Sequence, residues 1–272
     1  MKIAASTLGC PDWSLEEIIH NLSDYGYDGV EIRGIAGQTN IIKIPEFSQA
    51  KIEGTRSRLE TADLEVACVS TSSRFSSPDP EERQANIASA LGHIFIAKSL
   101  GSSLIRIFGG NIPQGVSRKE CAGYVQDSLK ILAEAAAKEG VTFVLETHDS
   151  FILAEDMLEV VEPVKSPGLG VLWDVLHPFR LGEPIKKTVR NLGPYMRHIH
   201  IKDAKLHKEG KHTLTLLGQG GVPLQEAISS LKEIGYEGWL SLEWEKRWHQ
   251  ELPEPEVAFP QAIEFMRRLI AS

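Results

Sequence analysis

Four residues with metal-binding side chains each lie at the end of a short apolar segment of the chain. The segments are Val144-Leu145-Glu146, Leu172-Trp173-Asp174, His198-Ile199-His200 and Leu242-Glu243. In a β-strand, successive side chains point to opposite faces. If the apolar residue before each ligand-type residue faces a layer of helices, all four ligand-type residues face the other side together. The four are Glu146, Asp174, His200 and Glu243.

Three carboxylates that converge on one place would repel one another, and a divalent cation is the simplest way to neutralise them. For one acid alone, solvation at a strand end is an equal alternative, but four in successive strands favour a shared site. One divalent metal on Glu146, Asp174, His200 and Glu243 is therefore predicted. Oxygen ligands with one imidazole favour Mn²⁺, with Mg²⁺, Co²⁺ or Zn²⁺ as alternatives, over a closed structural zinc site.

Short β-branched or apolar runs alternate with amphipathic helical segments along the whole chain, which is typical of parallel strands joined by helices. Eight such pairs over residues 1–272 predict a single α/β domain, a closed (β/α)₈ barrel with its active site at the C-terminal mouth of the strands. The predicted strands are Ile3–Thr7, Gly29–Arg33, Leu64–Ser70, Ser103–Phe108, Val141–Glu146, Leu169–Asp174, Met196–Ile201 and Gly238–Trp244.

Further polar residues at the predicted strand ends are candidates for substrate binding. They are Glu31, Arg106, Lys202 and His177. Each also has a simpler interpretation, since Glu31 and Arg106 could pair for stability and His177 could line a loop. Four other histidines, at 148, 207, 212 and 249, are expected in loops, from which one of them could reach the substrate. The Gly218-Gln219-Gly220-Gly221 segment either binds phosphate or forms a tight turn, and the turn is slightly favoured.

The composition indicates a globular protein with a small-molecule substrate. The 272 residues are 42% hydrophobic and 24% charged, with a formal net charge of −8, which opposes binding to nucleic acid or to an anionic membrane surface. Three widely spaced cysteines fit a reducing compartment, and Met1 leads directly into a predicted strand without a signal-peptide pattern. A cytoplasmic location is expected, and the oligomeric state, a homo-oligomer included, stays open.

These residues together resemble the xylose isomerase-like TIM barrel superfamily. The resemblance spans nearly the whole chain and is carried by Gly29-Val30-Glu31-Ile32, Leu145-Glu146-Thr147-His148, Asp174-Val175-Leu176-His177, His198-Ile199-His200-Ile201-Lys202-Asp203, Gly218-Gln219-Gly220 and Ser241-Leu242-Glu243-Trp244. It implies the same four metal ligands, Glu146 and Glu243 as the two glutamates that move protons, and substrate contact by His177. Many relatives have a histidine at the end of the third strand, where this chain has Ser70 to Arg74, so substrate contacts there differ.

The resemblance implies a metal-dependent isomerase or epimerase acting on a sugar, sugar phosphate or keto-inositol. Glu146 and Glu243 would transfer a proton next to a carbonyl through a metal-stabilised enediolate. The main alternative is a dehydratase of the 3-dehydroshikimate or inosose type, in which His177 or Lys202 helps a hydroxyl to leave. A remote alternative is an apurinic-site endonuclease. Such an enzyme needs further histidines on the third and fourth strands, which this chain lacks, and the net negative charge of the chain opposes binding to DNA.

Overall fold

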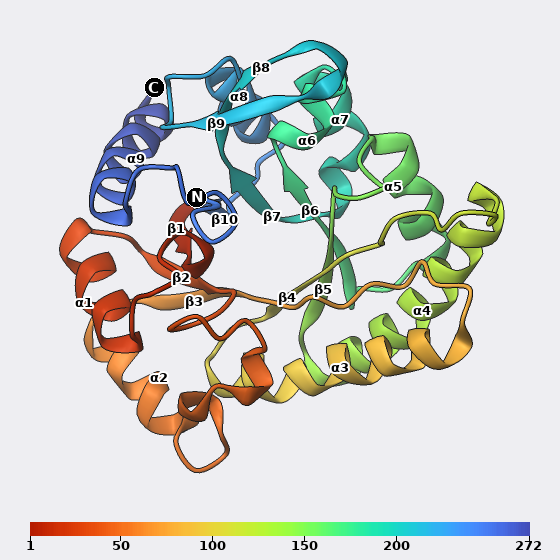
Figure 1. The fold of residues 1–272 in the computed structure, drawn as a ribbon, viewed down its shortest axis with the longest axis horizontal. Helices are drawn as coiled ribbons and strands as arrows, with labels where there is room; N and C mark the ends of the chain where they lie inside the picture. The colour runs from red at the N-terminus through yellow and green to blue at the C-terminus, as the bar shows by residue number, and fades with distance from the viewer.

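The computed structural model describes residues 1–272 and contains a closed barrel of parallel β-strands surrounded by helices (Figure 1). Around the barrel the strand order is β1, β10, β7, β6, β5, β4, β3, β2, and the predicted eight-stranded barrel is confirmed. The strands are β1 (Lys2–Ser6), β2 (Gly29–Ile32), β3 (Glu65–Ser70), β4 (Leu104–Ile107), β5 (Thr142–Glu146), β6 (Leu169–Asp174), β7 (Met196–Ile201) and β10 (Trp239–Leu242).

The helices form the outer layer of the barrel (Figure 1). They are α1 (Leu15–Tyr25), α2 (Ile52–Thr61), α3 (Pro80–Ser99), α4 (Arg118–Glu139), α5 (Ala154–Val161), α6 (Leu176–Arg180), α7 (Ile185–Leu192), α8 (Leu224–Glu233) and α9 (Pro255–Ala271). Local signals set several ends: Ser14 and Ser117 begin α1 and α4 with capping boxes, and Gly140 ends α4 at φ +71°. No helix is both long enough and apolar enough to cross a membrane.

Two apolar clusters lie on the two sides of the sheet. A cluster of 72 buried residues packs the strands against the helices and includes Leu145 and Trp173. A cluster of four residues fills the barrel interior: Cys68, Leu104, Val144 and Leu172. Because side chains alternate along a strand, Glu146 and Asp174, two positions after Val144 and Leu172, also face the interior and lie nearer the mouth.

A β-hairpin after β7 was not expected from the sequence. Its antiparallel strands are β8 (Asp203–Leu206) and β9 (His212–Thr215), and the turn between them carries Glu209 at φ +58° and Gly210 at φ +71°. The predicted loop location of His207 holds, whereas His212 lies in β9. The apolar residues of the hairpin are few: Ala204 and Leu206 in β8, and Leu214 in β9. The Lys and His residues around them make the strand pattern hard to recognise in the sequence.

The glycine segment after this hairpin forms a turn held by Asp203. The Asp203 carboxylate accepts hydrogen bonds from the backbone N–H groups of Gly218 and Gly220 at 2.9 and 2.8 Å, and from Val222 at 3.1 Å. A Cβ atom at Gly220 would lie 2.1 Å from Asp203 Oδ1. The carboxylate occupies the place where a phosphate would sit, so the geometry favours the turn over a phosphate site.

Candidate metal centre

The four predicted metal-binding residues converge inside the barrel mouth. Their ligand atoms all lie within 4.8 Å of one another, and all four side chains are buried. His200 Nδ1 lies 3.6 Å from Glu146 Oε1 and 3.4 Å from Glu243 Oε1. Glu146, Asp174 and His200 come from the ends of β5, β6 and β7, and Glu243 follows β10, so neighbouring strands bring one ligand each.

The donor atoms in this cluster fit a divalent cation. Both carboxylate oxygens of Glu146 and Nδ1 of His200 are buried and form no hydrogen bond. Buried polar atoms without partners are uncommon in folded proteins and mark places where an ion or water belongs. Burial raises the pKa of Asp174 to about 6 although Lys202 opposes this, and Glu243 and Glu146 raise it further. Added positive charge would relieve this repulsion.

Two buried cations partly neutralise the cluster. Lys202 Nζ lies 2.8 Å from Asp174 Oδ2 and 2.5 Å from Glu245 Oε1, and it also pairs with Glu243. Burial disfavours the charged ammonium, but these carboxylates outweigh it and hold the pKa of Lys202 well above its usual range. Arg106 Nη1 lies 3.2 Å from Glu146 Oε2. Arg106 therefore pairs with Glu146 and not with Glu31, which the sequence offered as its partner.

Glu31 lies one layer deeper in the barrel than the four ligands. Its carboxylate is fully buried, accepts a 2.7 Å hydrogen bond from Ser70 Oγ, and lies 2.8 Å from His198 Nε2 and 2.9 Å from His200 Nε2. Burial opposes its ionisation, but the two histidines hold the pKa of Glu31 well below its usual range. Because Nε2 of His200 is bound to Glu31, Nδ1 faces the other ligands. The buried position of Glu31 favours a role in orienting His200 over the substrate contact that was predicted for Glu31.

His198 was overlooked as a functional residue, although its spacing was available in the sequence. It lies two residues before His200 and therefore on the same inward face of β7. Glu31, His198 and His200 form a second group with metal-ligand geometry, but their atoms already bond one another. The group acts as a support for His200.

Substitution of the supporting carboxylate is expected to weaken metal binding. Glu31→Gln removes the charge that orients His200, and partners of this kind typically contribute 10- to 100-fold in metal affinity. The dissociation constant for Mn²⁺, measured by isothermal titration calorimetry, should rise by about that factor. Glu65→Gln, at an exposed position on β3, is the matched control. An unchanged constant in Glu31→Gln would remove the positioning role.

Two histidines line the mouth beside the ligands. His177, in α6, is buried with its Nε2 3.6 Å from Asp174 Oδ2, and its ring lies 4.9 Å from the ring of His148. Burial holds the pKa of His177 well below its usual range, so the ring is neutral. Arg180 Nε donates to His177 Nδ1 at 3.3 Å, which assigns the proton to Nε2. His177 therefore presents an N–H donor that suits a substrate oxygen.

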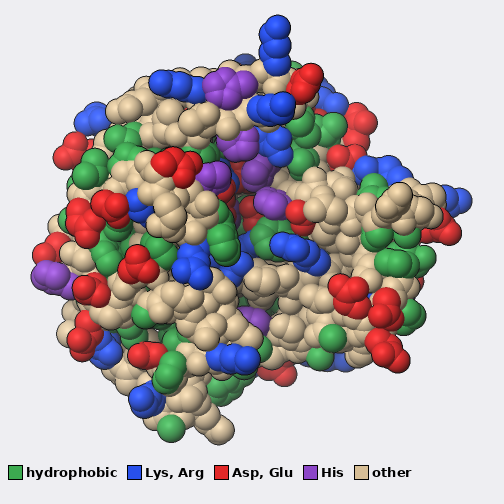
Figure 2. Space-filling view, viewed as in Figure 1, with side chains coloured by type: hydrophobic (Ala, Val, Ile, Leu, Met, Phe, Trp, Pro, Cys, Tyr) green, Lys and Arg blue, Asp and Glu red, His purple; other side chains and the backbone are tan.

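His148 lies in the loop after β5, as expected, and it joins this group: ligand atoms of Glu146, His148 and His177 lie within 4.8 Å of one another. Its position two residues after Glu146 places it on the same face of the chain. In Figure 2, histidine side chains gather round a hollow over the barrel.

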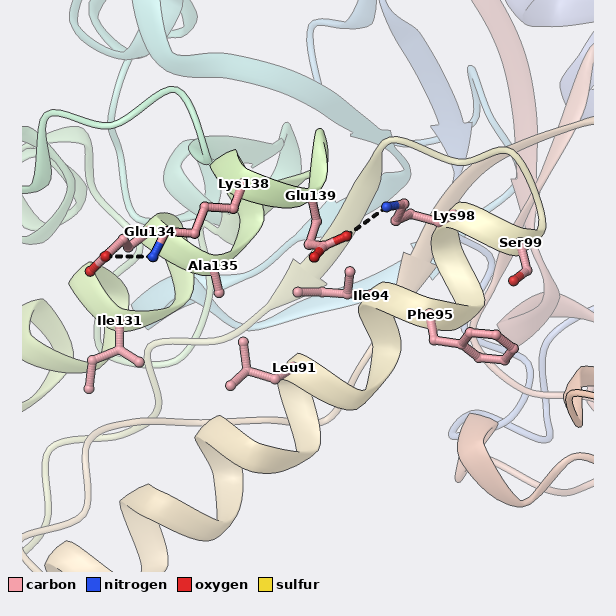
Figure 3. Close-up of a pocket in the computed structure, with 10 residues that line it drawn as sticks. All are labelled: Leu91, Ile94, Phe95, Lys98, Ser99, Ile131, Glu134, Ala135, Lys138 and Glu139. Atoms are coloured by element: carbon pink, nitrogen blue, oxygen red, sulfur yellow. Dashed lines mark hydrogen bonds and ion pairs between the residues drawn. The ribbon is translucent and has the colours of Figure 1, made fainter.

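A large surface hollow lies elsewhere. It is an open groove of about 770 Å³ between α3 and α4, lined by Leu91, Phe95 and Ile131 among others, with the ion pair of Lys98 and Glu139 at its end (Figure 3). None of the candidate ligands lines it. The barrel mouth is therefore identified as the candidate site by its chemistry and not by its size.

Known proteins are similar to this chain over most of its length. A family model described as "Xylose isomerase-like TIM barrel" matches residues 19–269. Fructoselysine 3-epimerase from Shigella flexneri is 24% identical over 280 residues, covering 99% of this chain and 98% of that protein. The 3-dehydroshikimate dehydratase from Bacillus anthracis is 25% identical over 246 residues, covering 85% of each protein.

Among solved structures, the crystal structure of IOLI protein with a binding zinc atom has a TM-score of 0.85 at 21% identity, and the match covers 100% of this chain and 98% of that chain. At this identity the likeness shows the fold. The family model, which spans most of the chain, also agrees with the motifs that carried the resemblance in the sequence. The chain belongs to the xylose isomerase-like TIM barrel family.

Proposed function

We propose that this protein is a divalent-metal-dependent isomerase or epimerase that acts on a sugar, sugar phosphate or keto-inositol. The observation that carries the proposal is the placement of Glu146 and Glu243, which reach His200 Nδ1 from β5 and from the end of β10. In the barrel, strands β6 and β7 lie between β5, which carries Glu146, and β10, which precedes Glu243. The two carboxylates therefore approach the centre from different sides, as removal and return of a proton on opposite faces of a substrate require.

The residues of the chain divide the proposed reaction between them. Burial opposes ionisation of Glu146, but Arg106 and His200 lower its pKa to about 2, so Glu146 is an ionised carboxylate able to accept a proton. Lys202 and His200 likewise overcome the effect of burial and hold the pKa of Glu243 well below its usual range. One glutamate would take the proton next to the carbonyl. The other, after it takes up a proton from solvent, would return that proton to the opposite face.

A bound cation would be held by Glu146, Asp174, His200 and Glu243 and would stabilise negative charge that develops on the substrate oxygens. The oxygen-rich donor set favours Mn²⁺, although zinc bound to the IOLI protein makes Zn²⁺ an alternative to compare. His177 would donate its Nε2 proton to a substrate oxygen. Arg106, which holds Glu146, and Lys202, which holds Asp174 and Glu243, would keep the carboxylates in place.

A dehydratase is the second candidate. The similarity to 3-dehydroshikimate dehydratase supports it, as does the buried His177 Nε2–H group, which could donate a hydrogen bond to a leaving hydroxyl. Both reactions begin with removal of the same proton. They differ only in whether a hydroxyl at the next carbon then leaves.

Proton NMR in D₂O separates the two reactions. The Mn²⁺-loaded protein is incubated with ketoses, keto-inositols and 3-dehydroshikimate. Loss of a signal next to the carbonyl together with a new epimer or isomer is the expected result. Appearance of an alkene or aromatic signal would replace the isomerase with the dehydratase. No change with any substrate, in a protein shown to bind Mn²⁺, would contradict both.

A further inference from the structure

Helix α3 lacks charged side chains along most of its length. Residues 84–97 contain no Lys, Arg, Asp or Glu, although these four types make up 24% of the chain. A helix on the surface of a globular protein normally has charged or polar residues on its outer face. The neighbouring helix α4 follows this rule, since its exposed residues include Asp127, Lys130, Glu134 and Lys138. The outer face of α3 therefore differs from an ordinary solvent-exposed face.

The exposed residues in the middle of α3 form a continuous apolar stripe. Ala85, Ala88, Gly92 and Phe95 are all exposed, and their spacings of three and four residues place them on one face of the helix. We call these four residues the α3 face. The side chain of Ile42 lies beside this face, because a Cβ atom at Gly92 would be 3.2 Å from Ile42 Cδ1.

The groove between α3 and α4 continues the α3 face on its other side. Phe95 and Ile131 both line this groove, and Leu91 lies between them and the barrel side of the helices (Figure 3). Three of the eight large hydrophobic residues that are strongly exposed in this chain therefore gather here: Ile42, Phe95 and Ile131, at 49, 46 and 48%. Exposed apolar residues that form one contiguous surface, rather than scattered positions, indicate an interaction site.

The charge of the chain limits which protein can bind this surface as a second copy of the chain. With a net charge of −8, two copies repel one another unless they meet where the surface is locally uncharged, as it is on the α3 face. The charges at the two ends of this face have opposite signs: Glu81 is exposed at the N-terminal end of α3, and Lys98 is exposed at the C-terminal end. Two antiparallel α3 helices would therefore bring Glu81 of each copy near Lys98 of the other.

The sizes of the side chains fit the same antiparallel arrangement. Three residues forward on one helix correspond to three residues back on the other, so Ala88 opposite Gly92 also places Ala85 opposite Phe95. The large Phe95 ring then meets a small residue, and Ala88 leaves room for Ile42, which lies over Gly92. Each of these contacts occurs twice around a twofold axis, as the interface of a symmetric dimer requires.

We propose that the α3 face is a homodimer interface, in which the α3 helices of two copies pack antiparallel about a twofold axis. The apolar residues supply the buried contact, and the Glu81–Lys98 pairs at its two ends fix the direction of the helices. None of the four candidate metal ligands lies on α3, so the inference does not depend on the proposed function.

Sedimentation equilibrium of the full chain tests the dimer. At concentrations up to about 100 μM, the protein should show a concentration-dependent mass that approaches that of two chains. A protein that stays monomeric over this range would overturn the proposal and would leave the α3 face to a partner other than a second copy. A dimer is the expected result, but it does not by itself locate the interface, so variants are compared.

Phe95→Glu is expected to raise the dissociation constant of the dimer at least about tenfold, because buried aromatic residues commonly dominate interface affinity and the new carboxylate would lose its water. Ala88→Arg, at the centre of the α3 face, should do the same by steric overlap. Val257→Glu is the matched control, since Val257 is 54% exposed in α9, outside this face. Affinity for Mn²⁺ should be unchanged in all three. A dimer that Phe95→Glu and Ala88→Arg weaken no more than Val257→Glu would reject the α3 face as its interface.

A charge exchange tests the antiparallel arrangement. Glu81→Lys and Lys98→Glu should each weaken the dimer several-fold, because each brings like charges together at both ends of the interface. The double variant restores opposite charges between the copies and should therefore dimerise more tightly than either single variant. A double variant weaker than both single variants would reject the antiparallel packing.

Discussion

Replacement of either proposed proton-transferring glutamate is expected to abolish measurable turnover. Glu146→Gln and Glu243→Gln keep the size of the side chain but remove the carboxylate that accepts or returns a proton. Positioned acid–base groups contribute about 10²- to 10⁴-fold to rate. At saturating Mn²⁺, kcat for the reaction detected by NMR should therefore fall by at least about 10²-fold in each variant.

Both glutamates are also candidate metal ligands, so the two roles must be separated. Isothermal titration with Mn²⁺ establishes saturation, and circular dichroism checks that each variant is folded. Glu65→Gln, at an exposed site, is the control for a general effect of charge loss. Full activity in either variant would remove that glutamate from the mechanism, whichever reaction the protein performs.

Lys202→Met is expected to destabilise the metal-free protein strongly. Lys202 is 1% exposed and pairs with Asp174, Glu243 and Glu245. Removal of one partner from a buried ion pair costs about 3–5 kcal/mol, because the remaining charges stay buried without compensation. The free energy of unfolding in urea should fall by about this amount. Saturating Mn²⁺ should restore part of the loss, because the cation provides counter-charge to Asp174 and Glu243.

The control for this experiment is Lys138→Met. Lys138 forms a surface ion pair with Glu134 in α4, and its side chain is 69% exposed. Surface pairs of this kind contribute about 0–1 kcal/mol. If Lys202→Met destabilised the protein no more than Lys138→Met, the ion pairs around Lys202 would not stabilise the metal-free site. If Mn²⁺ had no effect on Lys202→Met, the metal centre itself would be in doubt.

The strands and the inward direction of the four ligands could be predicted from the sequence. The predicted strands Leu169–Asp174 and Met196–Ile201 coincide with β6 and β7, and the others differ by one or two residues at one or both ends. Apolar runs and the two-residue alternation of side chains are local properties of the chain. For this reason Leu145 and Trp173 could be assigned to the helix side, and Glu146 and Asp174 to the interior, before any contact was known.

Which charges meet was decided only by the tertiary structure. Arg106 pairs with Glu146 on the adjacent strand, while Glu31 reaches across the barrel to His198 and His200. These contacts depend on the order and register in which the barrel closes, including the register shift between Val30 and Glu31, and neither is encoded within one strand.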